Sequence, residues 1–456
     1  MRRDTKRLGR REEGEHLNTA EFLREQMIQK GYSKNELIRR TGIDRSTFYQ
    51  IVGGRRTAAP EQFRSILKAL SLSREEWLAA ASLYEREQET PKESADNDRI
   101  RDFLAALDRG SEEEPGACPP VLLSFLERFA EHAGETDTLC IFATETLMSR
   151  FGILPTLQKL AAQKKEKLTI SYLCASLREN FDLESALRGI RTYLQCMKNK
   201  RLVLSVWYPG DAVLQPCVTP FPYFILAGDE LLVFREDGLQ VVPVLDPPII
   251  AAYQAHFARL TGAMKPSFCV NQAFEEELAL MQRTYEQAVG LDVYFFTPVP
   301  CVQLIATDAQ VLKYTGSRNM VAFRRTLEIL GVREITKLSG AERLFGEKQI
   351  TESGVRIPLE EEDLAAAEQV LRRRQGKTLF FANPERLCLP DDWAIFLFGG
   401  EYLFFMPAGE FDFEILVEDR NLAKAFHTFA VSRVSSVTPD LLENPLGEAG
   451  NEQTTS

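Results

Sequence analysis

The stretch SKNELIRRTGIDRSTFYQIVGGRR, residues 33–56, decides the fold of the N-terminal part of the chain. Ser33 followed three residues later by Glu36 is a capping-box signature, which predicts the start of a short helix. Gly42 stands where a tight turn needs a positive φ, so this helix is expected to end there. Asp44 is placed to cap a second helix, which a pair of glycines then ends. The stretch therefore predicts two short helices joined by a sharp turn.

Helices are expected on both sides of this pair. Residues 19–30 place four apolar side chains on one helical stripe: Phe22, Leu23, Met27 and Ile28. Pro60 is placed at the first turn of a further helix, whose apolar face would pack back on the pair. Over residues 19–84 the succession resembles the Cro/CI-type helix-turn-helix family, also called the XRE family. The resemblance lies in the L-x4-G-I turn, the short second helix ending in glycine, and the leucine-bearing helix after it.

In that family the second helix of the pair lies in the major groove of DNA. Carried over by position, the resemblance assigns base reading to the outward residues of this helix: Arg45, Ser46, Tyr49 and Gln50. Arginine can hold a guanine edge, and glutamine an adenine edge, through two hydrogen bonds each. Phosphate contacts are assigned to residues at the start of the preceding helix and just after the second one: Ser33, Lys34, Arg55 and Arg56.

The distribution of charge agrees with this assignment. Residues 1–90 hold 18 Lys/Arg and 14 Asp/Glu, a balance of +4, which leaves −15 for the rest of a chain whose net charge is −11. Phosphate contacts supply most of the non-specific affinity for nucleic acid, so an acidic segment is a poor DNA binder. DNA contact is therefore expected from the first domain alone.

The rest of the chain alternates strand and helix patterns, which favours α/β units with mixed sheets. We expect a multidomain protein, with an all-α helix-turn-helix domain followed by two related α/β lobes. The expected divisions are a disordered basic tail (1–16), the helix-turn-helix domain (17–86), an acidic linker with a short helix (87–118), a first lobe (119–265), a bridging helix (266–289), a second lobe (290–437) and a disordered tail (438–456).

An internal repeat underlies the two lobes. Residues 223–260 align without a gap on residues 394–431, and the helix and strand patterns before each stretch also match in order. Chance similarity between two hairpins is the alternative to a duplication. Upstream of this match the second copy diverges, and residues 293–314 are expected to contain an extra strand.

Signals of catalysis are missing from the body. In the order of their elements alone, the lobes weakly resemble a duplicated phospholipase D-like architecture, but no histidine is followed two residues later by lysine, so the H-x-K signature of that family is absent. There is no G-x-S-x-G and no H-E-x-x-H. The eight cysteines form no C-x-x-C pair and no Cys/His cluster, which disfavours a zinc site. We expect no enzyme activity, no metal and no cofactor.

A ligand cleft between the lobes is the remaining hypothesis for the body. Aromatic residues near strand ends and a pair of helix histidines at matching repeat positions are its candidates: Trp207, Tyr208, Tyr223, His256, Trp393 and His427. The alternative reading makes these aromatics ordinary core residues and these histidines hydrogen-bonded helix residues.

The sequence thus predicts a bacterial-type transcriptional regulator. Its expected partners are double-stranded DNA, a second copy of the chain in a homodimer, and an unidentified small-molecule effector. No apolar run of about eighteen residues and no secretory signal is found, so a cytoplasmic location without membrane contact is expected. A body that serves as a protein-interaction scaffold without a small-molecule ligand is the first alternative, and a DNA-targeted enzyme is the second.

Overall fold

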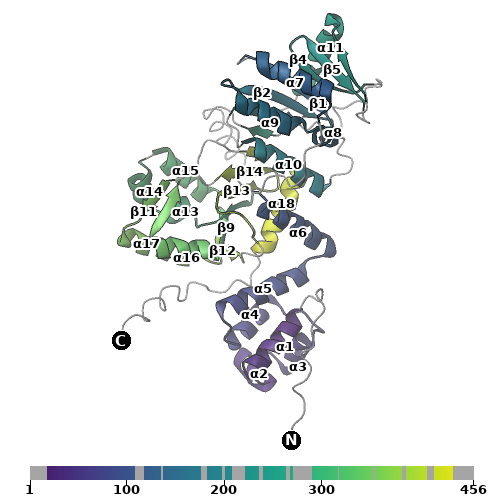
Figure 1. The fold of residues 1–456 in the computed structure, drawn as a ribbon. Helices are drawn as coiled ribbons and strands as arrows, with labels where there is room; N and C mark the ends of the chain where they lie inside the picture. Colours follow the sequence, from purple (N-terminus) through teal and green to yellow (C-terminus); the bar gives the residue numbers. More distant parts are fainter. Residues whose placement is uncertain are drawn as a thin grey trace, which may run out of the picture.

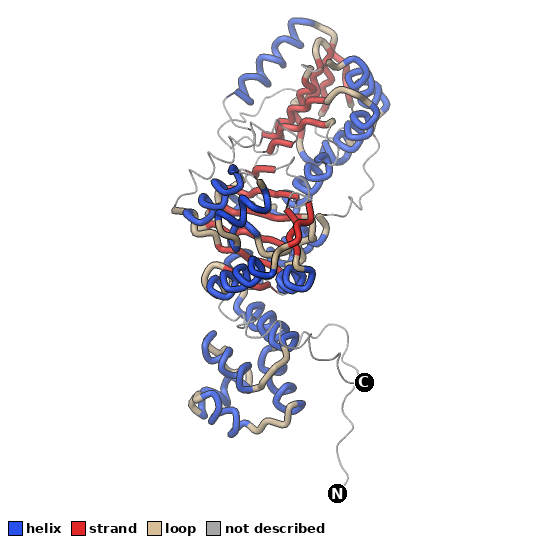
Figure 2. The backbone as a smooth tube through the Cα atoms, turned by 90° about the vertical axis from the view of Figure 1, so that its left-hand side faces the viewer, coloured by secondary structure: helices blue, strands red, loops and turns tan. Residues whose placement is uncertain are grey.

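Three parts follow one another along the long axis of the molecule in Figures 1 and 2: a helical N-terminal domain, the second α/β lobe, and the first α/β lobe at the far end. The computed structural model describes residues 18–107, 118–134, 137–175, 182–197, 201–207, 221–235, 240–262, 266, 268–270, 290–316, 318–352, 355–382, 387–407, 415–417 and 419–434. Both expected tails, and the expected bridging helix apart from residues 266 and 268–270, lie outside this part of the chain.

The N-terminal domain consists of five helices: α1 (Thr19–Gln29), α2 (Lys34–Thr41), α3 (Arg45–Val52), α4 (Pro60–Ala69) and α5 (Arg74–Gln88). They enclose an apolar core of their own, in which Leu37, Phe48 and Phe63 are fully buried. The expected stripe on α1 is only partly correct. Phe22, Leu23 and Met27 are buried, whereas Ile28 is 80% exposed, because its position turns away from the helices that α1 contacts.

The first lobe, between α7 and β7, is a seven-stranded mixed sheet with helices on both faces. Its elements are α7 (Pro120–His132), β1 (Thr138–Ala143), α8 (Glu145–Arg150), α9 (Ile153–Gln163), β2 (Leu168–Cys174), α10 (Leu183–Met197), β3 (Leu202–Trp207), β4 (Tyr223–Ala227), β5 (Glu230–Phe234), β6 (Val241–Val244), α11 (Pro247–Gly262) and β7 (Phe268–Val270). The strand order is β6-β5-β4-β1-β2-β3-β7, with β1, β2 and β3 parallel.

The second lobe is a six-stranded mixed sheet. Its elements are β8 (Val293–Thr297), α13 (Val302–Ile305), α14 (Asp308–Thr315), α15 (Arg318–Ile329), β9 (Arg333–Lys337), α16 (Leu338–Glu347), β10 (Gln349–Glu352), β11 (Val355–Pro358), α17 (Glu361–Arg374), β12 (Leu379–Ala382), β13 (Trp393–Phe398), β14 (Tyr402–Pro407), β15 (Ile415–Val417) and α18 (Arg420–Arg433). The strand order is β12-β9-β8-β13-β14-β15, and β10 and β11 form a separate hairpin.

The two sheets have the same topology from β1 to β6 and from β8 to β15. In each, three parallel strands are followed by three antiparallel ones in the same spatial order, and a helix closes the unit. The ungapped alignment of residues 223–260 with 394–431 places β4 on β13, β5 on β14 and α11 on α18. The extra strand expected in residues 293–314 is wrong: a single strand, β8, is followed there by the helices α13 and α14.

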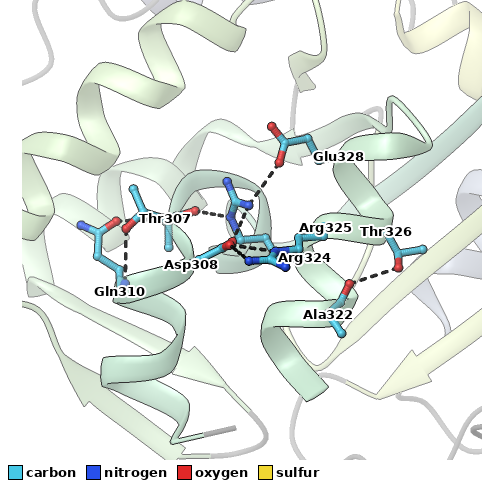
Figure 3. A network of polar contacts seen from close by, with 9 residues as sticks. Thr307, Asp308, Gln310, Ala322, Arg324, Arg325, Thr326 and Glu328 are labelled. Carbon is cyan, nitrogen blue, oxygen red and sulfur yellow. Dashed lines mark hydrogen bonds and ion pairs between the residues drawn. The ribbon is translucent and has the colours of Figure 1, made fainter. Parts of the chain in front are cut away.

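A network of charges joins α14 to α15, as Figure 3 shows. The Arg324 guanidinium lies 2.8 Å from the Asp308 carboxylate and 3.1 Å from that of Glu328, and Arg325 pairs with the other oxygen of Asp308 at 2.7 Å. Thr307 caps α14 by accepting a hydrogen bond from the Gln310 backbone N–H. These contacts fix α14 against α15, and α14 is one of the two helices found where an extra strand was expected.

Helix α6 (Pro91–Ala105) lies between the N-terminal domain and both lobes (Figure 1). An acidic linker with a short helix was expected over residues 87–118, but α5 continues to Gln88 and α6 then runs for 15 residues. This helix packs against α10 of the first lobe and α18 of the second. Its Phe103 side chain meets Phe405 and Phe426 edge-on, at centroid distances of 5.8 and 6.2 Å. Helix α6 is therefore part of the core that the lobes share.

The lobes meet along α10, α18 and the edge strands β7 and β15. One apolar cluster runs from the first lobe through α6 to the second, so the two lobes share a common core. Among the described helices, none combines the length and apolarity that crossing a bilayer requires.

Candidate nucleic-acid interface

The turn between α2 and α3 has the geometry that the sequence predicts. Gly42 ends α2 in the left-handed region at φ 69°, where a side chain is rarely tolerated. The Asp44 carboxylate caps α3 by accepting a hydrogen bond of 2.9 Å from the Thr47 backbone N–H. Hydrogen bonds from Thr47 lower the pKa of Asp44, and the positive charge of Arg56 adds to the effect. The carboxylate is thus held ionised at the N-terminus of α3, where the helix dipole favours negative charge.

Helix α3 has one face in the core and one in solvent. Phe48, Ile51 and Val52 are buried against the other helices of the domain. The four residues to which the sequence assigns base reading, Arg45, Ser46, Tyr49 and Gln50, all lie on the exposed side. A helix whose outer face carries hydrogen-bonding side chains and no aliphatic ones is suited to reading base edges in a groove.

The Tyr49 ring brings a candidate base-reading residue and a candidate phosphate-binding residue together. The Lys34 ammonium lies 5.1 Å from the ring centroid and the Arg45 guanidinium lies 5.7 Å from it. Both distances are in the range of a cation–π interaction. Tyr49 therefore holds one cation from each of the two helices on the same outer face. The sequence offered a signal for Arg45 and Tyr49, which are spaced i, i+4, but none for the contact from α2.

The candidate phosphate-binding residues flank this face. Lys34, Arg55 and Arg56 are exposed, and the Arg55 backbone N–H donates to the Gln50 carbonyl at 2.9 Å, which fixes the chain after α3. The Ser33 hydroxyl, a candidate phosphate contact, instead caps α2 by accepting a hydrogen bond from the Glu36 N–H at 3.2 Å.

Two other residues of α2 have roles that the sequence did not indicate. The Glu36 carboxylate, expected to complete a capping box, instead forms an ion pair of 2.7 Å with Arg40. The Arg40 guanidinium also stacks 4.7 Å from the centroid of the Tyr32 ring. Arg40 is therefore a structural residue of the domain, although its charge adds to the positive field.

Contacts from α5 hold the segment that follows α3. The Tyr84 hydroxyl donates to the Ala58 carbonyl at 2.7 Å, and the Tyr84 ring stacks on Phe63 at 4.4 Å. Burial raises the pKa of Tyr84, which keeps the donating proton in place. The segment between α3 and α4, which carries Arg55 and Arg56, is thus anchored to α5.

A family model described as a helix-turn-helix domain matches residues 20–80. Residues 20–80 are a helix-turn-helix domain. This helix-turn-helix domain is the DNA-binding segment of the chain, with α3 in the place of the second helix of the motif. No curated protein and no solved structure matches the chain.

The candidate effector residues lie in different surroundings. Trp207 and Tyr223 flank the apolar cluster between the first sheet and α11. Trp393 is buried in the core that the two lobes share, at the start of β13. Tyr208 lies outside the described residues. Trp207 ends β3, whose counterpart in the other sheet is β12, and Trp393 begins β13, whose counterpart is β4, the strand that Tyr223 begins.

The two histidines at matching repeat positions have different neighbours. His427 on α18 packs edge-on against Tyr294 at 5.5 Å. His256 on α11 lies 3.2 Å from the Arg259 guanidinium, and partial burial together with this charge lowers its pKa. Helix α11 lies at the outer end of the first lobe, whereas α18 lies at the centre of the molecule (Figure 1). A single site that contains both histidines of one chain has no support in this arrangement.

Proposed function

We propose that the protein is a transcriptional regulator of the Cro/CI type, in which α3 reads bases in the major groove of double-stranded DNA. The observation that carries the proposal is the outer face of α3, where Lys34 and Arg45 converge on the Tyr49 ring. The same face presents Ser46 and Gln50 to solvent. Arg45 and Gln50 would contact base edges, and Lys34, Arg55 and Arg56 the phosphates on either side.

We further propose that the two-lobed body senses an effector or sets the oligomeric state, and that it controls the orientation of the DNA-binding domain. Helix α6 supports this proposal, because it follows the domain directly and packs against α10 and α18. A change in the relative position of the lobes would therefore move α6. The shared topology of the two sheets also supports a duplicated body. The proposal assigns no catalysis to the body, in keeping with the missing catalytic motifs.

DNA binding by the full chain tests the first part of the proposal. Double-stranded oligonucleotides selected from a random pool should share a sequence motif, and the affinity for that motif should fall steeply with salt. A control pool of single-stranded DNA should give no enriched motif. Absence of salt-sensitive binding to double-stranded DNA at low ionic strength would show that the proposal is wrong.

Thermal shift of the full chain tests the second part. A ligand that binds only the folded state raises the melting temperature in a saturable way. A metabolite with this effect that also changes the affinity for the selected DNA supports sensing, since coupling between two sites is reciprocal. A stabilising ligand without any effect on DNA affinity argues against control of the domain by the body.

A further inference from the structure

An apolar surface lies at the end of the first lobe that is farthest from the DNA-binding domain. It consists of β6, the residue that follows β6, and the outer side of α11; we call it the α11 patch. Its exposed members are Val242, Leu245, Ile249, Ala251, Ala252, Ala255 and Ala258. Leu245 is 75% exposed and Ile249 is 44% exposed. Contiguous apolar surface of this kind on a folded protein marks an interaction site.

The α18 residues that align with these alanines face their own sheet as well as α6, because Phe426 lies 6.0 Å from Phe405 of β14 and Phe429 lies 5.9 Å from Phe296 of β8. Phe426, which aligns with Ala255, is fully buried and packs on Phe103 of α6. Phe429, which aligns with Ala258, is fully buried as well. Helix α18 thus carries large side chains at these positions, whereas α11 carries alanines that leave room for a second helix to approach closely. In α11 these positions are exposed alanines, because a different side of that helix, with Ile250, Phe257 and Leu260, is buried.

Two chain segments outside the described residues, 208–220 and 271–289, join the first sheet away from the patch. Residues 271–289 begin next to β7 and end next to β8, whereas β6 is at the opposite edge of the first sheet. Six strand spacings separate β6 from β7, roughly 29 Å. Nineteen residues span at most about 65 Å when fully extended. A path from β7 to β6 and back would therefore use nearly all of them. Residues 208–220 join β3 to β4 at the Tyr223 end of β4, whereas Leu245 is next to the other end.

The charges around the patch favour a two-fold arrangement with a second copy. Asp246 caps the N-terminus of α11 by accepting from the Ile249 N–H at 3.2 Å, and Arg259 is near the C-terminus. An antiparallel pair of α11 helices centred between residues 252 and 253 would bring Asp246 of each copy to the partner's Arg259. A head-to-tail contact with α17 of the second lobe is less suited, because α17 exposes charged residues such as Glu362 and Arg372.

We propose that the α11 patch is the interface of a homodimer, in which two copies of this chain pack α11 against α11 about a two-fold axis. The alanines lie at the centre of the interface, and Leu245 and Ile249 cover its ends. The proposal concerns the body alone, so its failure would leave the DNA-binding function untouched.

The mass of the full chain in solution tests the proposal. Size-exclusion chromatography with light scattering, at tens of micromolar protein and without DNA, should give the dimer mass. Leu245→Glu places a charge in the interface and should convert the dimer to monomer. Because Leu245 is exposed in the single chain, this change should leave folding intact. Ile329→Glu is the matched control, since Ile329 is 78% exposed on α15 and outside the patch.

A cysteine at the centre of the interface provides a second, independent measurement. Ala252→Cys should form an intermolecular disulfide on mild oxidation, because the two copies of residue 252 lie beside the two-fold axis. The wild-type chain, oxidised in parallel, controls for the native cysteines. Dimer loss in Leu245→Glu but not in Ile329→Glu, together with the cross-link, supports the proposal. A monomeric wild-type chain, a dimer that survives Leu245→Glu, or a dimer in which Ala252→Cys forms no cross-link overturns it.

Discussion

The Glu89 carboxylate lies 3.5 Å from the Arg433 guanidinium, and both side chains are almost fully buried. Glu89 follows the last helix of the DNA-binding domain, and Arg433 is the last residue of α18. The guanidinium also stacks over the Phe429 ring, 4.4 Å from its centroid. This pair joins the DNA-binding domain to the second lobe at the point where α6 begins.

Glu89→Gln should destabilise the full chain, because it leaves the positive charge of Arg433 buried without its partner. Breaking a buried pair in this way costs about 3–5 kcal/mol of the free energy of unfolding. Urea denaturation followed by circular dichroism measures the loss. Glu89→Gln combined with Arg433→Met should recover most of it. The control is Arg86→Gln, which removes an exposed pair with Asp98 at 3.7 Å and should change the free energy by less than about 1 kcal/mol.

Gly42→Ala should destabilise the helix-turn-helix domain through backbone strain alone. No heavy atom lies within 4 Å of the position that an alanine Cβ would take, but φ is +69°. The left-handed region costs an L-residue with a Cβ about 1–2 kcal/mol. Gly346→Ala, in α16 with ordinary φ and equally open space, should instead be neutral or stabilising. Equal melting temperatures for the two variants would show that the turn tolerates a side chain.

Arg45→Ala and Arg56→Ala should weaken DNA binding in different ways. Removing a guanidinium that reads a base should cost about 1–3 kcal/mol of binding free energy on the selected sequence and relax specificity at one position. Removing a phosphate contact should weaken binding to all sequences alike and lower the slope of affinity against salt by about one. Fluorescence anisotropy with specific and scrambled duplexes over a salt series separates the two. Loss of the same size on both duplexes for Arg45→Ala would contradict base reading.

The acid stability of the second lobe should depend on Asp363. Hydrogen bonds from Lys313, Tyr314 and Gln310 lower the pKa of this carboxylate to about 2. A lowered pKa in the folded state means that the ionised form stabilises the fold above the unfolded pKa of about 3.9, and that this contribution is lost as the pH falls toward 2. Asp363→Asn should therefore lower the melting temperature at pH 6 and have little effect at pH 2. An equal reduction at both pH values would show that the charge is unimportant.

The sequence predicted the helix-turn-helix domain well because its signals are local. Gly42, Asp44 and the apolar spacing of α3 act within a few residues, and each was found in its expected role. The predictions failed where contacts with distant parts of the chain determine the secondary structure. The acidic stretch before Ile100 has no apolar stripe, yet it is helical because Ile100 and Phe103 pack into a core formed with α18.

In the body, too, local sequence patterns predicted some features correctly, whereas features that depend on tertiary packing were missed. The repeat alignment placed α11 and α18 in matching positions, and the strand order agrees with it. The extra strand was wrong because short apolar runs such as Val302–Ile305 do not distinguish strand from helix by themselves. The Tyr49 ring contacts and the α11 patch depend on which side chains remain exposed, and exposure is decided by tertiary packing.

In the proposed control of the domain by the body, helix α6 would act as a lever arm. At 15 residues it is about 22 Å long, so a tilt of about 10° at one end displaces the other by about 4 Å. Successive base pairs of DNA are about 3.4 Å apart. A rearrangement of the lobes that is small on the scale of the body would therefore carry α3 past a full base step, enough to change the register of α3 on DNA in the proposed complex.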